Sequence, residues 1–221
     1  MLRPSILLSP AFFNRDPRKV ARDLLGKVLV RKVGRKKLAG RIVETEAYLG
    51  AGDAAAHSAA GKTLRNAVLF GPPGFAYVYF IYGNHYCLNV SCLPEGDAGG
   101  VLFRALEPID GIAEMARARG ITLPADSCVA DFDKLADSKT RLLLRKISSG
   151  PGRMCEALDI TRERDNGKSF VSPRSDLRIV EDGYRVRRVQ VGPRVGIKKS
   201  LEHNWRYVIA NNPFVSAPAI R

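Results

Sequence analysis

Two β-type runs, residues 75–82 and 85–92, are separated only by Gly83 and Asn84, and this spacing constrains the fold more than any other feature of the chain. A two-residue connection joins antiparallel strands, because parallel strands need a crossover of a dozen or more residues. Further runs of this type occupy 28–33, 38–48, 100–106, 186–195 and 205–209, with a basic turn over 34–37 between the first two. The sequence therefore predicts a mostly antiparallel sheet.

Helix signals lie outside these runs. Asp16 and Pro17 suit the N-cap and the first helical position, and Gly26 suits the residue after the helix end. Residues 109–119, 139–147 and 151–158 are also predicted to be helical, and 50–74 to form a long loop. With 221 residues, 45% of them hydrophobic, and no repeat or low-complexity linker, the chain is predicted to be one α+β domain over residues 1–221.

The charge is strongly basic and unevenly distributed. The net charge of +14 comes from the two ends: residues 1–40 carry 11 basic and 2 acidic side chains, and residues 161–221 carry 13 and 6. This pattern favours a polyanionic partner, of which nucleic acid is the commonest. General solubilisation by Lys and Arg is the alternative interpretation of the charge.

The cysteine and histidine positions argue against several classes. The four cysteines form no C-x-x-C, and the three histidines share no metal-ligand spacing with them, so we expect free thiols and no metal site. His57 is followed by Ser58 and Ala59, which excludes the His-x-Glu signature of zinc deaminases. No apolar run approaches a membrane span of ~20 residues, and Pro4 and Pro10 interrupt the N-terminal segment. We expect a cytoplasmic protein.

Several polar residues fall where a sheet would bury them. Strand periodicity places Glu44, Glu46 and Tyr48 on one face together with Ile42. Burial and like charge would raise the pKa of one of the two carboxyls, as general acid–base chemistry requires. An exposed face with two solvated carboxylates is the alternative. Arg104 interrupts another apolar run, and a structural pair with Glu44 would explain it.

The run 77–86 holds four of the seven tyrosines. Aromatic strands usually pack in a core, but a basic protein can also stack nucleic-acid bases on such side chains. Tyr82 sits at the predicted turn, where its side chain can project outward. Asn89 lies in an apolar run and needs a hydrogen-bond partner. His57, alone in a loop, carries little weight by itself.

Together these motifs resemble the alkyladenine (3-methyladenine or methylpurine) DNA glycosylases. The resemblance is carried by RIVETEAYLG at 41–50, AAHS at 55–58, YVYFIYG at 77–83, CLNV at 87–90, LFRALEP at 102–108, SGP at 149–151 and RVG at 194–196. It covers essentially the whole chain in order. It implies a single domain with a curved, mostly antiparallel sheet surrounded by helices, no metal and no redox cofactor.

The resemblance also implies residue roles. Glu46 would activate the water that attacks C1′ of a flipped nucleotide, with help from Arg104 and the backbone carbonyl of Val195 in holding that water. The remaining roles concern the damaged base and the duplex: a base slot of Tyr48, His57 and Tyr79, a wedge entering the duplex at Tyr82, and exclusion of a purine 2-amino group by Asn89.

The chemistry of glycosidic bond cleavage agrees with these roles. Cleavage of a purine glycosidic bond passes through an oxocarbenium-like state, which one carboxylate can stabilise while it orients water. Electron-rich aromatic faces favour a cationic base by ~0.5–2 kcal/mol. Two positions depart from the family pattern, Asn84 after the wedge and the weakly acidic stretch 51–54, and both bear on the range of lesions rather than on catalysis.

Three other functions fit parts of the sequence. A glycosylase-lyase would need a Schiff-base lysine, such as Lys198 or Lys199, in a desolvated pocket. An O-glycoside hydrolase is disfavoured because Glu44 and Glu46, two residues apart on a strand, would lie ~6.5 Å apart on the same side of a substrate. A non-catalytic nucleic-acid-binding module explains charge and tyrosines but not Glu46. The expected partner is double-stranded DNA containing damaged purines, with the protein acting as a monomer.

Overall fold

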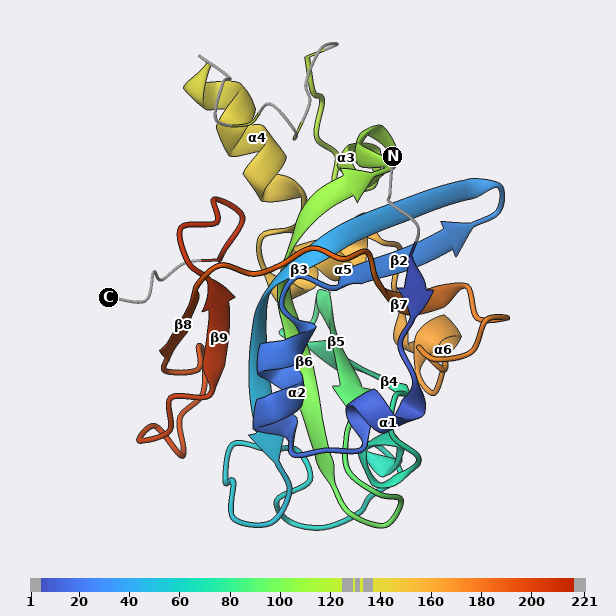
Figure 1. Cartoon of the computed structure of the whole chain (residues 1–221), viewed down its shortest axis with the longest axis vertical. Coiled ribbons are helices and arrows are strands. Elements are labelled where there is room, and N and C mark those ends of the chain that lie inside the picture. The colour runs from blue at the N-terminus through green and yellow to red at the C-terminus, as the bar shows by residue number, and fades with distance from the viewer. Residues whose placement is uncertain (1–4, 125–128, 130–131, 133–136, 217–221) are drawn as a thin grey trace.

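The longest strand, β3 (Lys36–Leu49), organises a nine-stranded antiparallel sheet in the computed structural model, which describes residues 5–124, 129, 132 and 137–216 (Figure 1). The main path runs β1-β7-β2-β3-β6-β5-β4. Strands β8 and β9 lie off this path and join through β9, which pairs with residues 44–46 of β3. The other strands are β1 (Ile6–Leu7), β2 (Val28–Val33), β4 (Ala76–Ile81), β5 (His85–Ser91), β6 (Gly99–Asp110), β7 (Leu177–Glu181), β8 (Val189–Gly192) and β9 (Arg206–Ile209).

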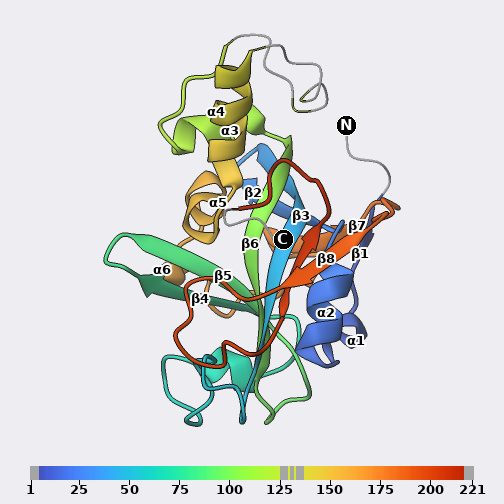
Figure 2. The same cartoon turned by 90° about the vertical axis from the view of Figure 1, so that its left-hand side faces the viewer.

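The helices lie on both sides of this sheet (Figure 2). On one side lie α1 (Pro10–Phe13) and α2 (Pro17–Leu24), and α2 packs on β3 and β6. On the other side lie α3 (Ile112–Ala118), α4 (Ser138–Ser148), α5 (Pro151–Ala157) and α6 (Arg162–Asp165), with α5 packed on β5 and β6. One short 3-10 helix, η1 (Ala67–Phe70), lies in the predicted long loop. The predicted α+β fold, with a curved and mostly antiparallel sheet, is confirmed.

Helix α2 begins and ends at the residues that the sequence predicted. The Asp16 carboxylate accepts a hydrogen bond from the backbone N–H of Arg18 at 2.8 Å, and Pro17 occupies the first turn. Gly26 follows the helix with a φ of +83°, the left-handed conformation that glycine adopts without strain. The buried face of the helix includes Ala21, whose carbonyl accepts a 2.8 Å hydrogen bond from the Thr45 hydroxyl of β3. The helix is thereby fixed against the strand that carries Glu46.

Two predicted elements had wrong bounds, and two strands were not predicted. The helix predicted at 109–119 begins at Ile112, because β6 continues to Asp110. Pro108 lies within this extension, where it pairs with Gly40 next to a register shift, a position that tolerates a residue without an N–H. The strand predicted at 186–195 is only Val189–Gly192, and β1 and β7 were not predicted at all.

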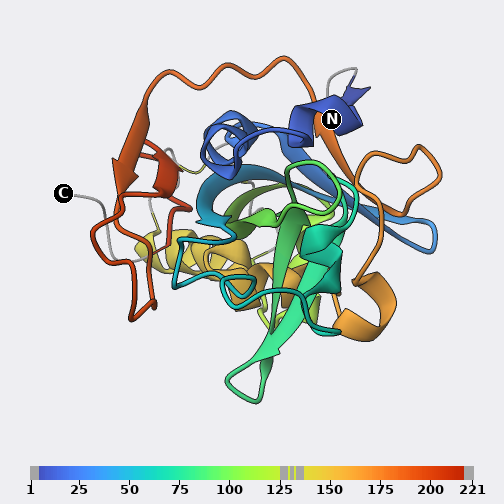
Figure 3. The same ribbon diagram turned by 90° about the horizontal axis from the view of Figure 1, so that it is seen from below.

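The β4–β5 hairpin projects from the body of the protein (Figure 3). Ile81 pairs with His85, and the backbone N–H of Asn84 donates to the Ile81 carbonyl at 3.4 Å. The central residues of the turn are therefore Tyr82 and Gly83, with φ of +56° and +74°, rather than the predicted Gly83 and Asn84. Three residues, 82–84, therefore separate the paired strand ends, one more than the predicted two-residue connection. Tyr82 consequently occupies the tip.

Two compensating β-bulges interrupt the pairing of β3 with β6. Between the pairs that start at Ile42 and Glu44, β3 has one extra residue, Val43; between the pairs that start at Glu44 and Thr45, β6 has one extra residue, Arg104. The register before and after the two bulges is therefore the same. Bulges re-aim side chains, and here they lie at the point where the acidic residues of β3 meet Arg104.

Candidate active site

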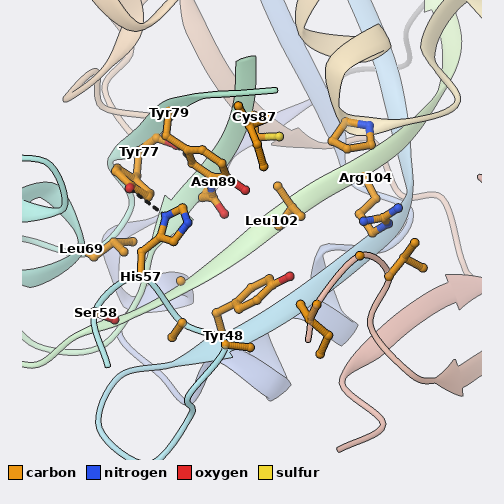
Figure 4. A pocket seen from close by; sticks show the side chains of 18 of the residues that line it. Tyr48, His57, Ser58, Leu69, Tyr77, Tyr79, Cys87, Asn89, Leu102 and Arg104 are labelled. Atoms are coloured by element: carbon orange, nitrogen blue, oxygen red, sulfur yellow. Dashed lines mark hydrogen bonds between the residues drawn. The ribbon is translucent and has the colours of Figure 1, made fainter. Parts of the chain in front are cut away.

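A cavity of about 500 Å³ lies between the β4–β5 hairpin, the ends of β3 and β6, and two loops (Figure 4). This volume is in the usual range for a small-molecule site. Of the eight residues predicted for the site, seven line the cavity, and Glu46 lies directly behind its wall. The lining comprises residues 54–58 and 195–199 and Tyr48, Leu69, Tyr77, Tyr79, Ile81, Tyr82, Cys87, Asn89, Gly100, Leu102, Arg104 and Pro151.

Glu46 is fully buried and is held by three cavity-lining residues. Its Oε1 accepts a 2.7 Å hydrogen bond from the backbone N–H of Val195 and lies 3.3 Å from Nη1 of Arg104. Its Oε2 accepts a 2.8 Å hydrogen bond from the Tyr48 hydroxyl. The sequence assigned Val195 a role through its carbonyl, and the structure adds this contact from its N–H.

Burial raises the pKa of Glu46 above the ordinary glutamate value. The positive charge of Arg104, the Val195 N–H and the Tyr48 hydroxyl all oppose this shift, and the neighbouring Glu44 carboxylate adds to it. The same surroundings raise the pKa of Tyr48, so its phenol stays protonated and can donate to Glu46. A carboxyl with a raised pKa next to a cavity has the properties of a general base.

Glu44 has a different role from Glu46. Its carboxylate accepts hydrogen bonds from Nε of Arg104 at 3.1 Å, Nε of Arg206 at 2.6 Å, and the backbone N–H and hydroxyl of Ser216 at 2.7 and 2.9 Å. The predicted structural pair of Glu44 with Arg104 is confirmed. Both acids are fully buried, so the alternative of a solvated acidic face was wrong.

Aromatic rings form the wall around the space between Tyr48 and Tyr79 (Figure 4). The His57 ring lies edge-on to the Tyr79 ring, with centroids 4.4 Å apart, and its Nδ1 lies 2.9 Å from the Tyr77 hydroxyl. Burial, with a contribution from Arg65, lowers the pKa of His57, which favours the neutral imidazole. His57 is therefore part of a fixed aromatic assembly and not an isolated loop residue.

Asn89 faces the same space from β5. Its Nδ2 donates to the backbone carbonyl of Tyr77 at 3.2 Å, which satisfies the predicted need for a partner. Because that carbonyl can only accept, the Asn89 amide is oriented by the sheet itself. Cys87 lies beside it in the lining, and burial raises the pKa of its thiol.

Tyr82 and two lysines lie at the mouth of the cavity. Tyr82 is 78% exposed, as predicted for a turn residue that projects outward. Lys198 and Lys199 are also exposed, so no desolvated environment surrounds either amine. These positions are compatible with contacts to phosphates.

Several residues of the site were not predicted. Tyr77 shares a strand face with Tyr79, and period-two spacing could have identified it as part of the same wall. Leu69, Cys87 and Leu102 also line the cavity, and their apolar character gave no separate signal. Asp53 and Arg194 form a buried ion pair behind the cavity, and only the long-range fold brings them together.

Two further properties concern the described residues as a set. No group of three or more His, Cys, Asp or Glu side chains among them is arranged to hold a metal ion. Their three cysteines, Cys87, Cys92 and Cys155, are free and buried, and Cys128 lies outside the described residues. In the same part of the chain, no helix is long and apolar enough to cross a membrane.

Comparison with known proteins assigns the family. Residues 11–213 match the family model for methylpurine-DNA glycosylase. A protein of Koribacter versatilis, provisionally named 3-methyladenine DNA glycosylase, is 64% identical over 209 residues, which cover 95% of this chain and 92% of the relative. Proteins of the same provisional name from Burkholderia cenocepacia and Alkaliphilus oremlandii are 41% and 38% identical, over 99% and 95% of this chain and 95% and 98% of their own lengths. The chain therefore belongs to the methylpurine-DNA glycosylase family of DNA N-glycosylases, which act in DNA repair.

Proposed function

We propose that this protein flips an alkylated or deaminated purine out of duplex DNA and hydrolyses its N-glycosidic bond with a water activated by Glu46, leaving an abasic site. The observation that carries the proposal is the buried Glu46 carboxylate behind an aromatic cavity, in contact with three of its lining residues. The candidate substrates are 3-methyladenine, which is in the names of the relatives, and 7-methylguanine, hypoxanthine and ethenoadenine.

The chemistry follows from the lone pairs of Glu46. A carboxylate has about four acceptor directions, and Val195, Arg104 and Tyr48 occupy three of them. The fourth, on Oε2, is where a water molecule would donate its proton. The water oxygen then bonds to C1′, the C1′–N bond breaks with its electron pair going to the base, and Glu46 receives the proton of the water. A cationic 3-methyladenine leaves as a neutral base, so this step needs no general acid.

The aromatic wall supports selection of the base. Tyr48, His57 and Tyr79 offer ring faces and edges to a planar guest, and electron-rich rings favour a cationic base by ~0.5–2 kcal/mol. The neutral His57 avoids a like charge beside such a base. Asn89, fixed by Tyr77, would meet the 2-amino group of guanine and oppose its entry. Damaged bases also pair weakly, which lowers the cost of flipping.

Tyr82 is the proposed wedge. Flipping a nucleotide costs a few kcal/mol, and stacking of an aromatic ring in the gap returns ~1–3 kcal/mol. Tyr82 is exposed at the tip of the hairpin whose inner face carries Tyr77 and Tyr79. One hairpin thus supplies both the wall of the base slot and the side chain that fills the gap in the duplex.

We further propose that the enzyme is monofunctional, acts as a monomer and works in the cytoplasm, on the nucleoid if the source is bacterial. A lyase step would need a lysine of depressed basicity in the cavity, and Lys198 and Lys199 are both exposed. The basic terminal regions favour contacts to DNA phosphates and a salt-dependent affinity.

The test is base release from duplexes carrying hypoxanthine or ethenoadenine, and from methylated DNA, by wild type and Glu46→Gln. We expect wild type to release the base and leave a strand that is cut only after alkali. Glu46→Gln should bind the lesion and release nothing, whereas Glu114→Gln, a change on α3 outside the cavity, should act as wild type. Tight binding without release by wild type would favour the second candidate, a non-catalytic module that stacks bases on its tyrosines.

A further inference from the structure

A buried ion pair lies behind the cavity and takes no part in the proposed chemistry. Nη1 and Nη2 of Arg194 bind the two carboxylate oxygens of Asp53 at 2.6 and 2.8 Å, and both side chains are fully buried. Burial alone would raise the pKa of Asp53, but the hydrogen bonds and charge of Arg194 outweigh it and lower the pKa. The Asp53 carboxyl is therefore held in its ionised form.

Arg194 connects this pair to the strand that carries Glu46. Its Nη1 also donates to the backbone carbonyl of Ala47 at 3.1 Å, and its guanidinium lies 4.7 Å from the centre of the Tyr48 ring. The Arg194 guanidinium also contacts Trp205, whose ring centre is 4.9 Å away. Arg194 thus touches both residues that follow Glu46 in β3.

Asp53 connects the pair to the loop that carries His57. Its carboxylate accepts hydrogen bonds from the backbone N–H groups of Leu49 and Ala55, both at 3.1 Å. A second link joins the loop that carries His57 to the 193–200 loop, which carries Arg194 and Val195. In this link the Ala54 N–H donates to the Ser200 hydroxyl at 3.1 Å. The ion pair therefore fixes the 193–200 loop relative to the strand and to the aromatic wall.

We propose that Asp53 and Arg194 are positioning residues for Glu46: their ion pair fixes the backbone at Val195, so that the Val195 N–H holds Oε1 and the remaining acceptor direction on Oε2 is left to the water. The inference rests on the proposed function, in which Glu46 is the base. A buried ion pair is weak support for stability, since apolar replacements are often equally stable. A reacting carboxylate must be held in an accurate position, and a bidentate Arg–Asp pair can fix the backbone that holds it.

The test compares Asp53→Asn and Arg194→Lys with wild type in single-turnover base release over a range of pH. Asn keeps the shape of Asp53 but removes its charge and one acceptor, and Lys keeps the charge of Arg194 but not its bidentate fork. Loss of the Val195 N–H contact would destabilise the ionised Glu46, so its pKa would rise. We expect the acidic limb of the profile to move to higher pH by about one unit and the rate near neutral pH to fall about tenfold. The charged or titratable groups facing Glu46 are Glu44, Tyr48, Cys87 and Arg104. Both variants leave all four side chains in place.

The chain offers a matched control. Arg41 on the same strand forms a bidentate pair with Asp182, with both contacts at 3.0 Å, and its guanidinium lies 4.0 Å from the Tyr184 ring centre. Neither residue lines the cavity. Asp182→Asn should lower the unfolding midpoint and leave the acidic limb where it is in wild type.

The possible results separate this inference from the proposed function. If Glu46→Gln releases bases as wild type does, the proposed function is wrong; if Glu46→Gln is inactive and the acidic limb of Asp53→Asn coincides with wild type, only the positioning role is wrong. If neither variant folds, hydrogen exchange of the wild-type Val195 amide decides. Slow exchange, as in the central strands, supports the clamp, and exchange as fast as that of the neighbouring exposed Gly196 overturns it.

Discussion

Glu44 and Glu46 both reach the guanidinium of Arg104, at 3.1 and 3.3 Å, although two carboxylates so close on one strand would normally repel each other. The two carboxylates have different further partners. Glu44 accepts hydrogen bonds from Arg104, Arg206 and Ser216, whereas Glu46 accepts from Val195 and Tyr48, which both line the cavity. One buried acid holds the arginine, and the arginine in turn holds the other acid.

The pH dependence of catalysis should report the surroundings of Glu46. Burial raises its pKa, and the base must be ionised, so activity is present above that pKa and is lost as the pH falls through it. On 7-methylguanine, which is already cationic and needs no general acid, we expect an acidic limb above the ordinary glutamate range. Arg104→Gln should move this limb further up than Tyr48→Phe, because the charge of Arg104 opposes the shift more strongly. A limb at or below the ordinary range would contradict the assignment of the base.

Removing Glu44 should destabilise the fold. Glu44→Ala leaves Arg104 and Arg206 buried without this carboxylate, which typically costs about 3–5 kcal/mol of the free energy of unfolding. Glu114→Ala, which breaks a surface pair with Lys36, should cost less than about 1 kcal/mol. Urea titration measures the free energy of unfolding of both variants. Equal losses would show that the Glu44 contacts stabilise the fold no more than a surface ion pair does.

Tyr82→Ala should weaken binding to a lesion duplex by ~1–3 kcal/mol and binding to the single strand much less. The control is Phe80→Ala on the same hairpin, because Phe80 is 45% exposed on the face away from the cavity, where it packs against Tyr86. Fluorescence anisotropy with matched duplex and single-strand probes measures both variants. Equal loss on the two probes would argue against a wedge.

Asn89→Ser should admit undamaged guanine. The shorter side chain cannot reach the Tyr77 carbonyl and leaves space where the 2-amino group would lie. Release of guanine from undamaged duplex is the measurement, and release of hypoxanthine by the same variant is the internal control for folding and catalysis. Guanine release no greater than that of wild type would remove the gatekeeping role.

Local signals predicted the parts of the fold that depend on neighbouring residues. The N-cap at Asp16, the antiparallel pairing of the hairpin strands and the shared face of Glu44, Glu46 and Tyr48 are all short-range properties, and the structure confirms them. The hairpin turn was displaced by one residue because Tyr82 adopts a positive φ, which is uncommon for a tyrosine.

Long-range contacts account for what the sequence did not predict. The Val195 N–H and Glu46 are 149 positions apart, and Arg194 and Asp53 are 141 apart, so no local pattern links them. The motif resemblance gave Val195 a role through its backbone carbonyl and did not predict the contact from its N–H to Glu46. Strand β7 was missed because Leu177–Glu181 is short and contains two charged residues, and pairing with β2 stabilises it.

The paired bulges at Val43 and Arg104 make the number of residues in each strand part of the active site. Deleting one residue between Ile42 and Glu46 would turn the carboxylate of Glu46 toward α2 and bring Thr45 to the side of Arg104. A homologue with such a deletion would keep the acid in its sequence and lose its contacts with the residues that line the cavity. Activity in divergent relatives should therefore follow the spacing of this segment more closely than it follows overall identity.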